Sequence, residues 1–183
     1  MRPTRGDIDE PITITEHDPS WPSLFESERA RVHEALGEVV TRIEHFGSTA
    51  VPGMAGKPVV DFLVGVTDLA LASERVRVLE ELGYENFGEV FFPGRIYLRR
   101  RGPIHFNVAM TVEGSPFWAD QILIRDYLRA HPEEAAAYAA CKRSAFAAGS
   151  RMFSTYSQAK GPFLSALRER ARPWQATRDR GWA

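Results

Sequence analysis

An apolar run with one charged residue inside it constrains the fold of this chain most. The segment Val59–Val66 reads VVDFLVGV, and Asp61 is its one ionisable side chain. A strand that is apolar on both faces is typical of the centre of a sheet with helices on each side. The run predicts an α/β (α+β) protein with a mixed β-sheet flanked by helices. It also places a carboxylate where burial is costly unless the group is paired, hydrogen-bonded or bound to a cation.

Strand and helix patterns alternate over the first two thirds of the chain, and helical patterns follow from residue 115. We expect strands at about 12–14, 39–46, 59–66, 84–92, 95–101 and 104–112, and helices at about 20–36, 68–82 and, in three pieces, 115–172.

The length of 183 residues suits one domain with a sizeable core. We assign residues 12–172 to it, with a sheet core at about 39–112 and a C-terminal helical region at about 115–172. Residues 1–11 are expected to form a flexible N-terminal arm, and residues 173–183 a polar C-terminal tail.

Charge and composition exclude several classes of protein. Lys and Arg number 23 against 24 Asp and Glu, so no global positive charge favours broad nucleic-acid binding. The longest stretch without a charged residue has twelve residues, 45–56, which is too short to span a membrane. Residues 1–11 lack the apolar region of a secretion signal, so we expect a cytoplasmic protein. The single cysteine, Cys141, excludes an internal disulfide and a cysteine-built zinc site.

The basic residues are unevenly divided. Three are lysines, Lys57, Lys142 and Lys160, and the other 20 are arginines. Arginine suits bidentate phosphate contacts, although a biased genome composition produces the same excess.

A Gly47-Ser48 turn follows the expected strand 39–46 and precedes a short helical piece. Backbone N–H groups and a hydroxyl gathered at such a turn suit a phosphate, whereas a tight turn with no ligand is the structural alternative. Asp61 would arrive beside the turn on the next strand. Asp61 either has a functional role or has a structural one, in which a buried arginine or a helix N-terminus is its partner.

The segment 45–61, HFGSTAVPGMAGKPVVD, closely resembles the signature of the GrpB family. Further matching pieces are DPSWP at 18–22, RIYLR at 95–99, FNV at 106–108, RDYLRAHP at 125–132, and Tyr156 with Lys160. The resemblance spans about 12–172. It implies a fold similar to that of nucleotidyltransferases, and related domains occur fused to dephospho-CoA kinase.

The resemblance also implies a site. Nucleotidyltransferases carry Gly-Ser and three acidic residues that hold two divalent ions around a triphosphate. Asp61 matches the first acidic position, but the second is Leu63 and the third falls at His105 or Asn107, so the standard set is incomplete. A single Mg²⁺ or Mn²⁺ held by Asp61 and a nucleoside triphosphate, or a metal-free phosphate site, remains open. Gly47, Ser48, Thr49, Lys57 and Asn107 are the expected ligand contacts of this turn and its neighbouring strands.

Three further groups complete the candidate site. Arg95 and Arg99 flank Tyr97 on one strand face, where they either clamp phosphates or protect an exposed edge strand. His45 and His105 could serve with Asp61 as general bases or metal ligands, as hydrogen-bonding groups, or as packing.

Tyr156 and Lys160 lie four residues apart and share a helix face. Lys160 would reach a phosphate, or else is an ordinary solvated lysine. Its reach toward phosphate is similar to that of a lysine in the helical region of nucleotidyltransferases.

Two functions of different classes follow. One is an enzyme that transfers a nucleotidyl group, most simply AMP from ATP, to a hydroxyl or amine of an unknown acceptor. The other is a noncatalytic module that binds a nucleotide, a CoA-like ligand or a protein partner. A repurposed pocket using His45, Asp61 and His105 is a third alternative, because fold resemblance does not settle function.

Overall fold

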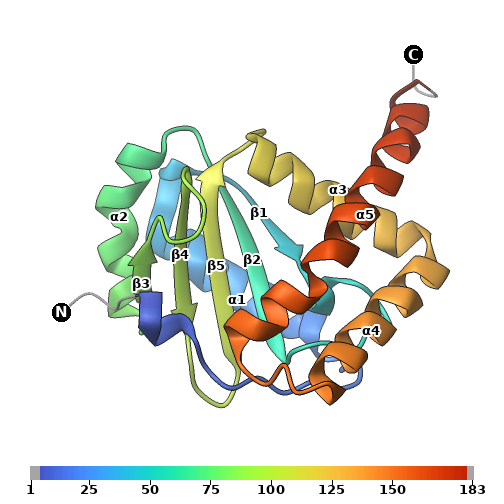
Figure 1. Cartoon of the computed structure of the whole chain (residues 1–183). Helices are drawn as coiled ribbons and strands as arrows, with labels where there is room; N and C mark the ends of the chain where they lie inside the picture. Colours follow the sequence, from blue (N-terminus) through green and yellow to red (C-terminus); the bar gives the residue numbers. More distant parts are fainter. Residues whose placement is uncertain (1–4, 181–183) are drawn as a thin grey trace.

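The computed structural model describes residues 5–180, and a five-stranded mixed sheet forms its centre (Figure 1). The strand order is β1-β2-β5-β4-β3; β2 and β5 are parallel and the other neighbours are antiparallel. The strands are β1 (Val40–Phe46), β2 (Val59–Val66), β3 (Glu85–Gly88), β4 (Arg95–Arg100) and β5 (His105–Val112). The apolar run is thus a strand with a neighbour on each side, as its composition predicts.

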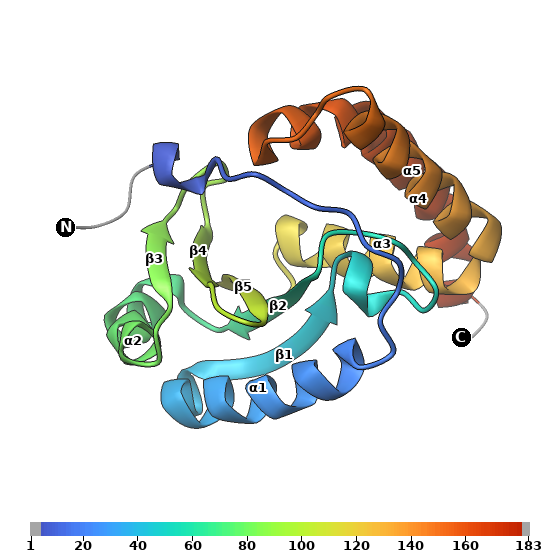
Figure 2. The same cartoon turned by 90° about the horizontal axis from the view of Figure 1, so that it is seen from below.

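Helices cover both faces of this sheet, and Figure 2 shows the two layers from below. One face packs on α1 (Trp21–Leu36) and α2 (Leu69–Glu81), and the other faces α3 (Pro116–Ala130), α4 (Pro132–Ala147) and α5 (Phe153–Arg180). Short 3₁₀ turns lie at Arg5–Ile8, Gly37–Val39 and Ser48–Ala50. The mixed sheet, flanking helices and C-terminal helical region predicted from the sequence are confirmed.

Side-chain alternation along β2 decides which residues reach the site. Phe62 and Val64 enter the core shared with α1 and α2, whereas Leu63 packs with Ala109 and Trp118 on the opposite face. Asp61 shares the face of Leu63 because alternate strand residues point the same way. The carboxylate therefore faces the C-terminal helices.

The N-terminal segment is not a free arm over residues 5–11. Ile8 is fully buried, and its carbonyl accepts a hydrogen bond from Arg99. The expected strand 12–14 is wrong; single bridges join Pro11 to Met152 and Thr15 to Gly56 instead. These contacts lay the segment across the sheet face toward α5 (Figure 2).

The expected C-terminal tail also differs. Helix α5 continues through Pro173 to Arg180, and Trp174 packs against the cluster that holds Leu167 and Ala171. Trp174 therefore anchors the extended helix within the expected tail. Residues 1–4 and 181–183 lie outside the described part. No helix within residues 5–180 is long and apolar enough to cross a bilayer.

Candidate functional site

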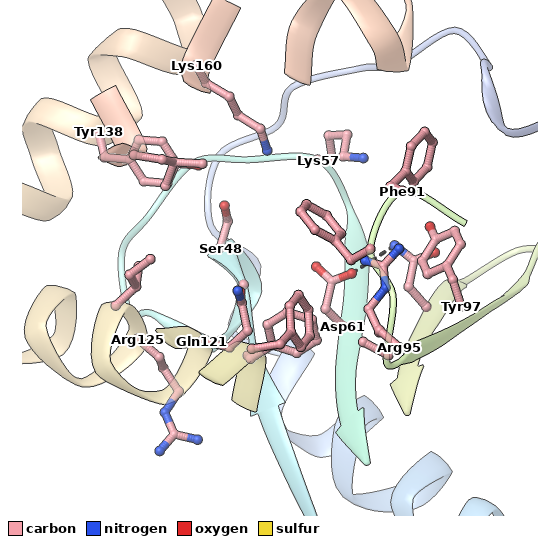
Figure 3. Close-up of a pocket in the computed structure, with 18 of the residues that line it drawn as sticks. Ser48, Lys57, Asp61, Phe91, Arg95, Tyr97, Gln121, Arg125, Tyr138 and Lys160 are labelled. Carbon is pink, nitrogen blue, oxygen red and sulfur yellow. Dashed lines mark hydrogen bonds between the residues drawn. The ribbon is translucent and has the colours of Figure 1, made fainter. Parts of the chain in front are cut away.

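A cavity of about 320 Å³ opens between the Asp61 face of the sheet and helices α3, α4 and α5 (Figure 3). Eight of the residues expected from the sequence line it: Gly47, Ser48, Lys57, Asp61, Arg95, Asn107, Tyr156 and Lys160. They come from four strands or their ends and from α5, so only the folded chain brings them together.

Asp61 forms the floor of the cavity. Its Oδ1 accepts a hydrogen bond of 2.8 Å from Nδ2 of Asn107, the residue that pairs with it across β2 and β5. Arg101 donates to Oδ1 of Asn107 at 3.1 Å and to Glu10 at 2.7 Å, which links the carboxylate to the N-terminal segment. Burial raises the pKa of Asp61, and Lys57 and the Asn107 hydrogen bond oppose that rise.

The Gly47-Ser48 turn lies directly against this carboxylate. Gly47 has φ +72°, and a Cβ on it would lie 2.6 Å from Oδ2 of Asp61. Both the left-handed backbone and the close approach require glycine here. The predicted adjacency of the turn and Asp61 is confirmed. The helical piece that follows has three residues, Ser48–Ala50, so the Ser48 side chain is the polar group that this turn contributes to the cavity wall.

All three lysines of the chain gather here. Lys57 and Lys160 line the cavity, and Lys142 lies behind its wall, where its Nζ donates to Oγ of Ser48 at 2.8 Å. Burial lowers the pKa of Lys57 to about 8, and Lys160 adds to that shift. Burial also lowers the pKa of Lys160, against the attraction of Asp61. The chain thus places its compact ammonium groups in one place, although arginine is its usual cation.

Positive charge exceeds negative charge in the cavity. Asp61 is the one carboxylate among its described lining residues. Arg125 and Arg168 are neutralised by ion pairs with Glu44, Asp126 and Asp120. None of the ion pairs within residues 5–180 involves Lys57, Lys160 or Arg95. Three cations therefore share one half-buried carboxylate, which favours an anionic ligand.

Arg95 is a buried cation surrounded by aromatic rings. Its guanidinium lies 5.0 Å from the ring centres of Phe92 and Tyr97 and 5.4 Å from that of Phe117. One Nη donates to the carbonyl of Val90, while the buried Nε has no partner in the described chain. Burial lowers the pKa of Arg95.

Aromatic side chains also rim the rest of the cavity. Phe91 lies 6.1 Å from Phe153, and Phe92 lies 5.8 Å from Phe117, measured between ring centres. Phe91 holds a left-handed φ of 69°. Phe91 and Phe92 are partly exposed on the loop between β3 and β4. The rim offers apolar faces beside the charged side chains of the cavity, and a planar ring stacks well on such faces.

Two expected site residues, His45 and Thr49, do not line the cavity. His45 pairs with Phe62 in the sheet, stacks on Phe25 at 4.6 Å and is bonded through Nε2 to Thr49 Oγ1 at 2.9 Å. Thr49 in turn donates to the carbonyl of Val59. Burial lowers the pKa of His45 to about 4, so the ring is neutral. The predictions that His45 and Thr49 contact the ligand are corrected. Strand alternation points His45 toward α1, and the hydroxyl of buried Thr49 is bonded to His45 and Val59.

His105 does not converge on Asp61 either. It pairs with Val59 at the start of β5 and is absent from the cavity lining. No group of three or more His, Cys, Asp and Glu side chains able to hold a metal occurs within residues 5–180. The set of two histidines and one carboxylate is therefore wrong.

Arg99 serves the N-terminal segment. Its guanidinium donates to the carbonyl of Ile8 at 2.7 Å and pairs with Glu10 at 3.0 Å, and its side chain is 3% exposed. Strand β4 lies between β5 and β3, so the exposed-edge interpretation of its arginines is also wrong. Two arginines are expected at the site from the sequence. The structure brings Arg95 to the cavity, whereas Arg99 contacts Ile8 and Glu10 of the N-terminal segment.

We expect Arg99→Met to lower the free energy of unfolding by about 1–2 kcal/mol, because the buried carbonyl of Ile8 loses its donor while Glu10 keeps its pair with Arg101. The affinity for any ligand of the cavity should stay within about twofold of the wild type. Urea unfolding and calorimetry measure the two effects. A large loss of affinity in a folded variant would return Arg99 to the site.

The donor set does not fit a pair of divalent ions. Leu63 occupies the second acidic position, and the residue opposite Asp61 is the neutral Asn107, which donates to the carboxylate. Lys57 and Lys160 act electrostatically on the same carboxylate. Mg²⁺ and Mn²⁺ prefer several anionic oxygens, so one carboxylate flanked by ammonium groups is a poor site for two such ions.

Sequence reasoning missed Lys142, Gln121, Tyr138 and the aromatic rim as parts of the site. The count of three lysines was the available signal for Lys142. Gln121 and Tyr138 lie on α3 and α4, in segments that predict helices and nothing more specific. Their positions depend on how the helices dock on the sheet.

Comparison with known proteins places the chain among proteins of similar sequence. The family model described as "GrpB protein" matches residues 11–170. The UPF0157 protein YqkA of Bacillus subtilis is 31% identical over 92% of this chain, which spans about half the length of that relative. The UPF0157 protein BH1888 of Halalkalibacterium halodurans is 34% identical, with 87% of this chain and 82% of the relative covered. A dephospho-CoA kinase of Mycolicibacterium paratuberculosis is 29% identical over 94% of this chain and 48% of its own length.

A solved structure agrees with this assignment. The crystal structure of conserved protein GrpB from Enterococcus faecalis aligns with a TM-score of 0.81 and 31% identity, covering 88% of this chain and 99% of the other. Terminal uridylyl transferase 4 from Trypanosoma brucei with bound UTP has 18% identity and covers 88% of this chain and 56% of its own. Its TM-score of 0.40 is too low to support an inference about function. The matched family model, the relatives and the shared fold together show that this chain belongs to the GrpB family.

Proposed function

We propose that the cavity binds a nucleotide or a similar phosphate-bearing ligand, and that it does so without a divalent ion. The observation that carries this proposal is the unpaired cation set: Lys57, Lys160 and Arg95 face one cavity in which Asp61 is the one described carboxylate. A phosphate chain supplies the negative charge that these cations lack. Each charge-assisted hydrogen bond that it forms is worth about 1.5–3 kcal/mol.

The cavity walls suggest how such a ligand lies. The phosphates would contact Ser48 and the ammonium groups of Lys57 and Lys160, all of which line the cavity (Figure 3). The base would lie against the aromatic rim near Phe117, where Gln121 offers an amide. CoA carries both a nucleotide and a pyrophosphate, so CoA and dephospho-CoA belong to the same ligand class.

Binding is tested by melting the whole chain with ATP, UTP, CoA, dephospho-CoA or inorganic tripolyphosphate, each in EDTA and in Mg²⁺. At 100 times its dissociation constant a ligand should add about 2.7 kcal/mol to the free energy of unfolding, a rise of about 5–10 °C in Tm. The rise should persist in EDTA. Tripolyphosphate should bind more weakly than a nucleotide if the rim holds the base.

Two results would contradict the proposal. No shift with any of the five compounds would favour a module that binds a protein partner. A shift seen with Mg²⁺ and lost in EDTA would show that Asp61 and the ligand hold a metal ion after all.

A further inference from the structure

Ser48 and Lys142 form a buried contact at the edge of the cavity. Nζ of Lys142 lies 2.8 Å from Oγ of Ser48, and the lysine is 1% exposed. No ion pair in the described chain involves Lys142; it lies over the ring of Tyr138, with Nζ 4.6 Å from the ring centre. Ser48 is partly exposed and lines the cavity. A hydroxyl that reaches the ligand space is thus held by an amine that has no carboxylate partner.

Gly56 keeps the two groups in contact. A Cβ at this position would lie 2.7 Å from Cβ of Ser48, 3.1 Å from its Oγ and 3.3 Å from Nζ of Lys142. Its φ is not left-handed, so close approach is the reason for glycine here. The chain therefore leaves out a side chain where one would separate the hydroxyl from the amine.

The surroundings of Lys142 favour the neutral amine. Burial lowers its pKa to about 7, and two cations act in the same direction: Lys160 on α5 and Arg143 on α4. Cys141 on α4 opposes them. A neutral amine can accept the proton of a hydroxyl that it contacts, which is how a serine is activated by a neighbouring base.

We propose that Ser48 is a nucleophile activated by Lys142, and that it accepts a phosphoryl or nucleotidyl group from the ligand in the cavity. The identity of the donor rests on the proposed function; the activation of Ser48 does not. Oγ attacks phosphorus, and the Oγ–P bond forms as the bond from phosphorus to the bridging oxygen of the anhydride breaks. The hydroxyl proton goes to Nζ of Lys142, and the departing phosphate group keeps the electron pair. Lys57, Lys160 and Arg95 would balance the charge on the phosphates.

The first test uses a probe that does not depend on nucleotide binding. Diisopropyl fluorophosphate presents a phosphorus electrophile, and attack by Ser48 releases fluoride while Lys142 takes the proton. We expect one adduct per chain, found by peptide mass spectrometry on Ser48. The labelling rate should rise with pH through about 7 as Lys142 loses its proton. Absence of label on Ser48 in the folded wild type would overturn the proposal.

Variants separate activation from simple exposure. Lys142→Met should slow labelling by about 100-fold or more, the usual contribution of a general base. Lys142→Arg keeps a charge that does not titrate, so it should be as slow and lose the pH profile. Arg172→Met removes an exposed cation of α5 that pairs with Glu169, and it should label at the wild-type rate. Unchanged labelling in folded Lys142→Met would overturn the role of the lysine.

Gly56→Ala gives a second route if Lys142 variants fail to fold, because it keeps both groups and separates them. It should slow labelling in the same way, with circular dichroism confirming the fold. Labelling at the wild-type rate in this variant would count against the proposal.

In the second test the wild type is incubated with ATP, and its intact mass is measured. An added phosphoryl or adenylyl group on Ser48, absent from Ser48→Ala, supports transfer. If ATP stabilises the protein and no adduct forms, transfer is overturned and the proposed binding stands. If the fluorophosphate labels Ser48 and no nucleotide binds, the proposed function fails and the activated serine stands with a different donor.

Discussion

Replacing Lys57 and Lys160 together by Met should weaken the binding of ATP or tripolyphosphate by at least about 100-fold, a loss of about 2.7 kcal/mol or more. The same double variant should be more stable than the wild type when no ligand is present, by about 1–2 kcal/mol. Burial lowers the pKa of both lysines, which means that the folded chain pays to keep them charged. Calorimetry measures the loss of affinity, and urea unfolding measures the gain in stability.

The pH dependence has a defined sign. Because the pKa of Lys57 falls from 10.5 to about 8 on folding, the unfolded chain holds more protons between these values. The free energy of unfolding should therefore rise with pH from about 8 toward 10.5. Affinity for an anion should fall over the same rise, because Lys57 becomes neutral. Stability and anion affinity therefore change in opposite directions with pH, as they do in the double variant.

Arg172→Met is the matched control, since Arg172 lies exposed on α5 beside Glu169. It removes one positive charge from the helix that carries Lys160 and should change neither affinity nor stability by more than about 0.5 kcal/mol. If the double lysine variant binds ATP as the wild type does, the phosphates lie elsewhere. If it loses stability, the two ammonium groups hold the fold together.

The strand pattern was sufficient to predict the centre of the fold and the centre of the site. Val59–Val66 could bury both faces only as an inner strand, and its one carboxylate had to meet a partner, which is Asn107. The Gly47-Ser48 turn is fixed by local backbone geometry and close approach to Asp61. Local sequence and the cost of burying charge sufficed for these features.

The wrong or missed site residues depend on strand register and on how distant segments pack against the sheet. His45 lies one residue before Phe46, which pairs with Asp61, and that single step moves its ring to the α1 face. Arg99 has the spacing of a clamp, but its partners are Ile8 and Glu10, about 90 residues away in the chain. Lys142 reaches Ser48 because α4 docks behind the turn. Contacts of this kind depend on tertiary packing that strand or helix periodicity does not encode.

Leu63→Asp should reduce the free energy of unfolding by about 4–5 kcal/mol, near the upper limit for a single substitution. Leu63 is fully buried with Ala109 and Trp118, so the variant loses an apolar contact and buries a carboxylate. Leu63→Asn is the matched control, because it has a similar shape and no charge. Burial should raise the pKa of the new carboxyl group above its unfolded value, so the penalty relative to Asn should grow as pH rises above the ordinary range of Asp and disappear below that range.

The same variant tests whether this site is one carboxylate short of a metal centre. In sequence, Leu63→Asp creates the acidic pair that the resemblance to nucleotidyltransferases leads one to expect on this strand. In the structure, Leu63 lies beneath Trp118 and outside the cavity lining, so the added carboxylate would be sealed from the ligand space that Asp61 faces. Mn²⁺ should therefore not restore the lost stability, and a melting series with and without Mn²⁺ measures this. Recovery specific to Leu63→Asp and absent from Leu63→Asn would show that Asp61 can share an ion with its strand neighbour, and the metal-free proposal would fall.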